Sequence, residues 1–179
     1  ADKYQAVFGA IFMPTSVINL VAGFVIRPYI TKLSEQWERN ALPEFAGTVG
    51  RLAAIIAALT ALAVGGAWIL GIPVLSMLYP KIAYMLRECR LALAFIILGG
   101  AFNAYVNLFY YALIIMQEQK RIFLGYVGVT AAALLISSPC VRAAGLLGGS
   151  LSYLLLMAAL TACFGLTSLV MYRRRVRGI

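Results

Sequence analysis

The sequence has no histidine and only six acidic residues. A membrane enzyme needs a general base or metal ligands, and a proton-coupled carrier usually keeps a carboxylate or histidine inside the membrane. We therefore expect no enzyme, no metal site and no cofactor here, and any carboxylate that couples an ion would have to lie outside this chain. All the acids fall outside the central parts of the apolar runs: Asp2, Glu35, Glu38, Glu44, Glu88 and Glu118.

Cysteine is also scarce. Cys89, Cys140 and Cys163 are odd in number and widely spaced, so they indicate neither a disulfide framework nor a CxxC-type metal site. We interpret them as small packing residues.

Charge is the next shortage. Charged residues make up 12% of the chain, hydrophobic residues 63%, and the mean hydropathy is +0.93. A soluble domain has about 25% charged and about 45–50% apolar residues, and a soluble helical bundle needs polar outer faces. Long stretches here have no such face, so we predict an integral membrane protein whose first partner is the lipid bilayer.

The apolar runs predict an all-α fold, a polytopic transmembrane helix bundle. About 20 apolar residues cover a hydrocarbon core of about 30 Å. Residue 1 is Ala and no signal-peptide pattern follows it, so we expect 1–179 to be a single incomplete transmembrane domain from a longer chain. Five spans are predicted, at about 5–29, 51–78, 91–116, 122–138 and 143–172.

The positive residues predict the orientation. The net charge of +9 is spread between apolar runs and over the tail, which favours positive-inside sorting and not a nucleic-acid partner. The tail and the connections after the first and third spans carry Arg27, Lys32, Arg39, Arg51, Lys120, Arg121, Arg173, Arg174, Arg175 and Arg177; the opposite side carries fewer, namely Lys3, Lys81, Arg87, Arg90 and Arg142. We therefore expect a cytoplasmic C-terminus.

Two prolines and one loop complicate the spans. Pro14 and Pro73 lie inside predicted spans, where each is expected to kink its helix, and the second span is expected to leave the hydrocarbon at Tyr79 and Lys81. Residues 31–45 alternate apolar and charged side chains. They are either an amphipathic segment with Trp37 at headgroup depth or a solvated loop.

Small residues suggest where the helices pack. Gly145 and Gly149 form a GxxxG pattern, and Gly99 and Gly100 are adjacent in the third span. Glycine allows the close backbone approach by which helices associate in a bilayer, so these positions predict helix contacts.

Uncharged polar residues are the candidates for contact with a ligand. Asn103 and Asn107 are four residues apart and so share one helix face, Tyr111 continues the row, and Asn19 lies in the first span. Such amides could bind sugar hydroxyls or phosphate oxygens in a wet cavity, or they could hold two helices together.

Two arginines flank the first cytoplasmic connection. Arg27 ends the first predicted span and Arg51 opens the second. A guanidinium binds phosphate through two hydrogen bonds, so this pair could receive a pyrophosphate headgroup. The alternative is that both side chains reach to ordinary lipid headgroups.

The order of these motifs resembles that of a known family. The C-terminal half of bacterial polysaccharide-biosynthesis flippases, in the multidrug/oligosaccharidyl-lipid/polysaccharide exporter superfamily, is similar over nearly the whole chain. One departure is Pro80, where the family commonly has glycine after Leu-Tyr. The stretches that carry the resemblance are AIFMPTSVINLVAGFVIRPYITKLSEQW, GIPVLSMLYP, LGGAFNAYVNLFYYALIIMQEQK and GLLGGSLSYLLLM.

The resemblance implies a two-lobe exporter fold of which this chain is part of the second lobe. It implies a transporter in the bacterial cytoplasmic membrane that flips an oligosaccharide repeat unit linked to undecaprenyl pyrophosphate, for surface polysaccharide synthesis. A polysaccharide polymerase and assembly proteins are the implied protein partners. The alternatives are a multidrug or metabolite exporter of the same superfamily, and a membrane assembly subunit that transports nothing.

Overall fold

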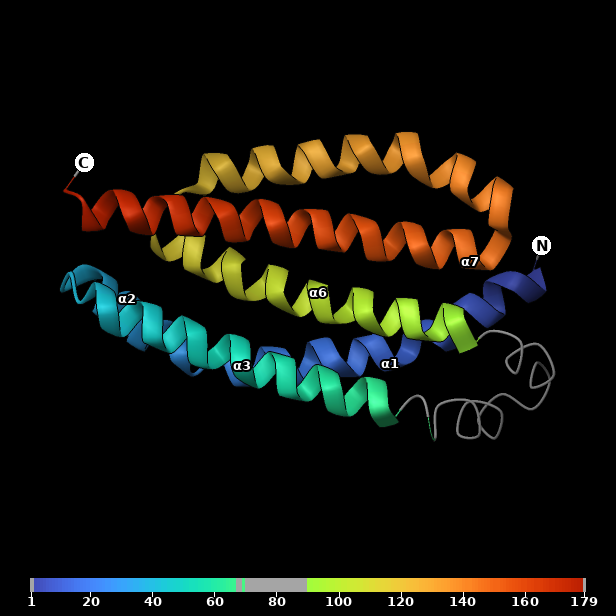
Figure 1. The fold of residues 1–179 in the computed structure, drawn as a ribbon, viewed down its shortest axis with the longest axis horizontal. Coiled ribbons are helices and arrows are strands. Elements are labelled where there is room, and N and C mark those ends of the chain that lie inside the picture. The colour runs from blue at the N-terminus through green and yellow to red at the C-terminus, as the bar shows by residue number, and fades with distance from the viewer. Residues whose placement is uncertain (1, 67–68, 70–89, 179) are drawn as a thin grey trace.

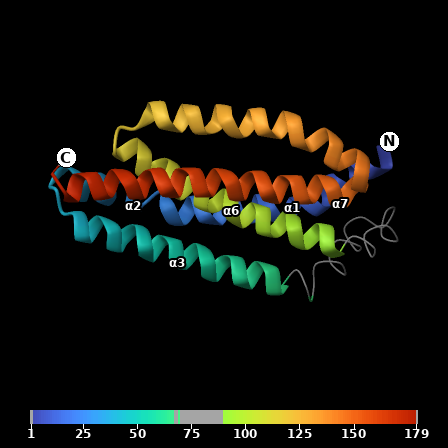
Figure 2. The same ribbon diagram turned by 45° about the horizontal axis from the view of Figure 1, so that its top comes forward.

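The computed structural model describes residues 2–66, 69 and 90–178. Over these residues the chain is helical and contains no β-strand, which confirms the all-α prediction. The long helices lie roughly side by side along one axis (Figures 1 and 2). They are α1 (Asp2–Ile26), α2 (Tyr29–Glu38), α3 (Leu42–Gly66), α6 (Arg90–Ile115) and α7 (Gln119–Val176).

The helices have the dimensions of membrane spans. By length and composition four of them could cross a bilayer, and a bent pair, Thr15–Ile26 with Tyr29–Glu38, could form a fifth. This architecture is compatible with a multi-pass membrane protein. The four are Leu42–Gly66, Leu91–Ile115, Gln119–Arg142 and Ala144–Val176.

The first predicted span, 5–29, ends earlier than expected. The helix stops at Ile26, and the chain bends by 49° into α2. Pro28 lies at this bend and has no backbone N–H to continue the hydrogen-bond ladder. Pro14 lies within α1, whereas Pro73, Tyr79 and Lys81 lie outside the described residues.

Helix α2 decides the conformation of residues 31–45. Its side chains Leu33 and Trp37 are buried, and the Trp37 ring packs against Phe45 of α3, with centroids 5.1 Å apart. This segment is therefore an amphipathic helix folded onto its neighbours and not a solvated loop. Helix α3 then begins at Leu42, before the predicted start of the second span at 51, with Pro43 in its first turn, where a missing N–H costs nothing.

The boundary between the fourth and fifth predicted spans also moves. Residues 139–142, expected as a loop, stay helical, and the break falls at Gly145, which has a left-handed φ of 54°. Gly145 faces open space, so it serves the turn and not a GxxxG contact. The close approach is at Gly148, where an added Cβ would overlap the carbonyl oxygen of Cys140.

Helix α6 is the central helix of the described bundle. Just over half of its apolar window is buried (56%), compared with 11% for α3. Each of its three long neighbours is joined to it by a hydroxyl group that donates to a backbone carbonyl oxygen. These bonds are Thr15 Oγ1 to Ile96 O (3.2 Å) from α1 to α6, Tyr105 OH to Ala53 O (3.0 Å) from α6 to α3, and Thr161 Oγ1 to Phe102 O (2.9 Å) from α7 to α6.

The C-terminal end of α7 is fastened to α2. The guanidinium of Arg175 lies 4.2 Å from the centroid of the Trp37 ring, and it donates to Trp37 O (3.0 Å) and to Asn40 Oδ1 (3.2 Å). Figure 1 shows the C-terminus, α2 and the start of α3 together at one end of the bundle. The basic tail and the basic first connection therefore share an end.

Removing the Arg175 contacts should destabilise the packing of the C-terminal end of α7 against α2. We expect Arg175→Ala to lower the free energy of unfolding by about 1–2 kcal/mol, because a cation–π contact and two charge-assisted hydrogen bonds are lost at a partly exposed site. Thermal unfolding in detergent measures the change. Arg174→Ala is the control, because that side chain has the same charge and takes no part in these contacts. Equal shifts in the two variants would show that only the charge matters.

Candidate functional site

The candidate site lies along the contact between α1 and α6. Thr15 of α1 fits against Gly100 of α6 so closely that an added Cβ would overlap its methyl group. The same residue bonds to Ile96 O, one turn earlier in α6. Because α1 and α6 run in the same direction (Figure 1), residues further along α1 face residues further along α6.

Asn19 is one turn beyond Thr15 on this face. Its Nδ2 donates to Thr15 O at 3.0 Å, whereas its Oδ1 is buried and has no hydrogen-bond partner in the described residues. A buried acceptor without a partner costs about 1–3 kcal/mol. Asn103 is likewise about one turn beyond Gly100 on α6. Asn19 and Asn103 therefore lie at a similar position along the axis of the bundle.

Asn103 and Asn107 continue the polar row on α6. Both are half-buried, and within the described part of the chain neither side chain makes a hydrogen bond. Tyr111 is half-buried too, packs against the core, and its ring lies 5.6 Å from that of Tyr110. We call Asn19, Asn103 and Asn107 the amide row.

The hydrogen bonds between helices indicate whether Asn103 and Asn107 serve packing. If Asn103 and Asn107 joined helices, their amides would bond across a helix contact. In the described residues the side-chain bonds across helix contacts come instead from the hydroxyls of Thr15, Tyr105 and Thr161, and from the Arg175 guanidinium at the end of the bundle. Asn103 and Asn107 therefore do not join helices through hydrogen bonds in the described residues.

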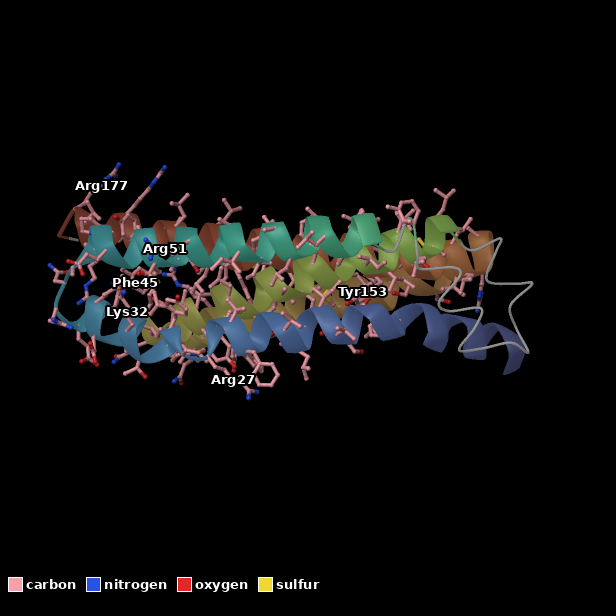
Figure 3. The ribbon with its side chains drawn as sticks, turned by 90° about the horizontal axis from the view of Figure 1, so that it is seen from below. Arg27, Lys32, Phe45, Arg51, Tyr153 and Arg177 are labelled. Atoms are coloured by element: carbon pink, nitrogen blue, oxygen red, sulfur yellow. The ribbon has the colours of Figure 1, made fainter. Side chains whose placement is uncertain are left out.

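The two predicted arginines are not brought together. Figure 3 shows Arg27 on the outer side of the bundle, away from α3, whereas Arg51 projects from α3 toward α2. Both are exposed. Arg27 lies in the bend between α1 and α2, whereas Arg51 lies within α3.

Lys32 takes the place predicted for Arg27. It lines, together with Arg51, a pocket of about 310 Å³ between α2 and α3. Sequence reasoning missed this grouping, although the spacing of Lys32 and Gln36, and of Glu44, Thr48 and Arg51, puts each set on one helix face. The pocket is lined by Lys32, Gln36, Glu44, Gly47, Thr48 and Arg51.

Among the residues that the structure describes, no three His, Cys, Asp or Glu side chains are grouped so that they could hold a metal ion. The polar chemistry available there is that of amides, hydroxyls and scattered cations.

Comparison with known proteins adds no further assignment. No family model, curated protein or solved structure matches the chain.

Proposed function

We propose that the chain is the partial second lobe of a two-lobe membrane transporter. Its cargo is an oligosaccharide repeat unit on undecaprenyl pyrophosphate, which it flips across the bacterial cytoplasmic membrane for surface polysaccharide synthesis. In this assignment the C-terminus is cytoplasmic, and a polysaccharide polymerase and assembly proteins are its partners. The motif order described above is one support for this assignment.

The amide row is the structural observation that carries the proposal. A sugar presents hydroxyl groups that both donate and accept hydrogen bonds, and an amide offers both functions without a charge. The buried Oδ1 of Asn19 and the free amides of Asn103 and Asn107 provide such groups within long apolar helices. A glycan sliding past them would gain hydrogen bonds and meet no fixed charge that would trap it.

The transport role is tested by deleting the full-length gene. Lipid-linked repeat units should then accumulate on the cytoplasmic leaflet and surface polysaccharide should fall, as measured by leaflet-selective labelling and by glycan staining. Normal surface polysaccharide in the deletion strain would contradict the proposal.

The amide row is tested in the complemented strain. We expect Asn103→Ala with Asn107→Ala to lower transport about tenfold, because two hydrogen bonds to the cargo are lost, while protein abundance in the membrane stays within about twofold of the unsubstituted protein. Adding Tyr111→Phe tests whether the row extends to that hydroxyl. Surface polysaccharide is measured per amount of protein by immunoblot.

Two controls separate transport from packing. Thr60→Ala removes a hydroxyl that bonds only within its own helix, to Ile56 O, and should leave transport unchanged. Thr161→Ala removes a bond between helices and should lower abundance and transport together. If the double asparagine variant behaves like Thr161→Ala, the amides serve packing and the proposed cargo contact is wrong.

A further inference from the structure

The pocket between α2 and α3 has no part in the proposed transport contact. We call it the α2–α3 pocket; its volume is about 310 Å³. Figure 3 shows Lys32 and Arg51 on the facing sides of the two helices. The pocket thus has walls from two helices, which are packed together through the rings of Trp37 and Phe45.

The charged groups of this pocket form no ion pair with one another in the described residues. In the described residues the ion pairs within 4.0 Å are Arg39 with Glu35 and Arg121 with Glu118. Lys32, Arg51 and Glu44 are in neither pair, although all three line the pocket. The pocket therefore presents two cations and one carboxylate to whatever enters it.

Gln36 adds an independent observation, an unpartnered polar group at the same pocket. Its side chain lines the pocket, only 6% of the residue is exposed, and its Oε1 is buried with no hydrogen-bond partner in the described part of the chain. Burying an amide oxygen without a donor is unfavourable. A donor on a bound molecule would satisfy it.

The position of the pocket along α3, next to the start of its uncharged stretch, points to a lipid headgroup. Arg51 is the last charged residue before the uncharged stretch 52–66 of α3, one of the helices able to cross a bilayer. Lysine and arginine side chains gather where the hydrocarbon meets the headgroups. The pocket opening therefore lies at the layer that holds lipid phosphates.

From these observations we propose that the α2–α3 pocket binds the zwitterionic headgroup of a phosphoethanolamine lipid. Lys32 and Arg51 bind the phosphate, for which ammonium and guanidinium groups are suited. Glu44 and the Oε1 of Gln36 accept hydrogen bonds from the lipid ammonium group. The bound lipid is a resident of the fold and not its cargo, so this site does not depend on the proposed transport function.

The experiment is native mass spectrometry of the full protein in detergent. Phosphatidylethanolamine or phosphatidylglycerol of the same acyl chains is added, and the retained lipid is counted. We expect phosphatidylethanolamine to bind about tenfold more tightly, as one charge-assisted contact more would give. Lys32→Gln with Arg51→Gln should remove binding of both lipids, whereas Glu44→Gln should remove only the preference between them.

Lys120→Gln is the matched control for charge. Lys120 is exposed on another helix, and its substitution should leave lipid retention unchanged. If this variant loses as much lipid as Lys32→Gln or Arg51→Gln, the attraction is a general surface effect and the proposed site is wrong. Equal retention of the two lipids by the unsubstituted protein would contradict the ammonium contact. If soluble phosphoethanolamine displaces the lipid at equal concentration, the site takes a small metabolite and the lipid assignment is overturned.

Gln36→Met separates a ligand role from a packing role. Methionine nearly matches glutamine in shape and removes the unpaired acceptor, so we expect the lipid-free protein to melt at a higher temperature while lipid retention falls about threefold. If Gln36 served packing only, melting temperature would drop and lipid retention would stay the same, and the assignment of its Oε1 to the ligand would be wrong.

Discussion

Gly148→Val is expected to abolish the folded protein. A Cβ at this position overlaps the carbonyl oxygen and carbon of Cys140, and backbone atoms cannot swing aside as a side chain can. Overpacking costs about 1–3 kcal/mol where neighbours can move, so the cost here should exceed that range. The two antiparallel halves of α7 would be forced apart beside the turn at Gly145. The yield of monodisperse protein in size-exclusion chromatography measures the effect.

Gly128→Val is the control for this prediction. Gly128 lies in the same helix, and an added Cβ there meets nothing within 4 Å. Glycine and valine are both weak helix formers, so the control should keep most of the yield. If both variants express equally well, the two halves of α7 do not approach each other as described.

The second large effect is expected where α1 meets α6. Gly100→Ala places a methyl group onto the Cγ2 of Thr15, whose hydroxyl is held by Ile96 O. We expect the free energy of unfolding to fall by about 2–3 kcal/mol, because α1 must move away and the hydrogen bond is strained. Unfolding by heat or denaturant in detergent measures the loss.

A second substitution should reverse most of that loss. Thr15→Ser removes Cγ2 but keeps the hydroxyl, and the remaining Cβ lies 3.1 Å from the place that a methyl group at residue 100 would occupy. The double variant should therefore recover at least half of the stability, with a coupling energy of about 1 kcal/mol or more. Gly23→Ala on α1, with nothing within 4 Å, should be neutral. Independent effects of Thr15→Ser and Gly100→Ala would mean that α1 and α6 do not touch there.

The helical architecture can be predicted because it depends on local composition. Apolar runs long enough to cross a bilayer indicate helices wherever they occur, and the described helices follow them. The end of the first helix is harder to predict. Pro28 is visible as a helix breaker, but the apolar character continues to Tyr29 and Ile30, so hydropathy alone extends the span straight through a 49° bend.

The site can be predicted only in part. The spacing of Asn103 and Asn107 puts them on one face in any helix, and they do lie in one helix, α6. That Asn19 reaches the same depth depends on the fit of Thr15 against Gly100, which relates residues far apart in sequence. The prediction that Arg27 and Arg51 act as a pair rests on their positions at predicted helix ends. In the structure Lys32, and not Arg27, lines a pocket with Arg51. That grouping depends on how α2 and α3 pack, which is a tertiary feature.

The gathering of basic residues at one end has an electrical consequence. Arg51, Lys32 of α2 and Arg177 of the tail lie toward the same end of the bundle (Figure 3). Across a membrane potential, moving one elementary charge from one face to the other takes about 2.3 kcal/mol for each 100 mV. In the inverted orientation, each basic residue in excess at this end would raise the free energy of the molecule by that amount. For a bundle inserted in an energised membrane, the resting voltage therefore favours the orientation that puts the basic end on the negative side.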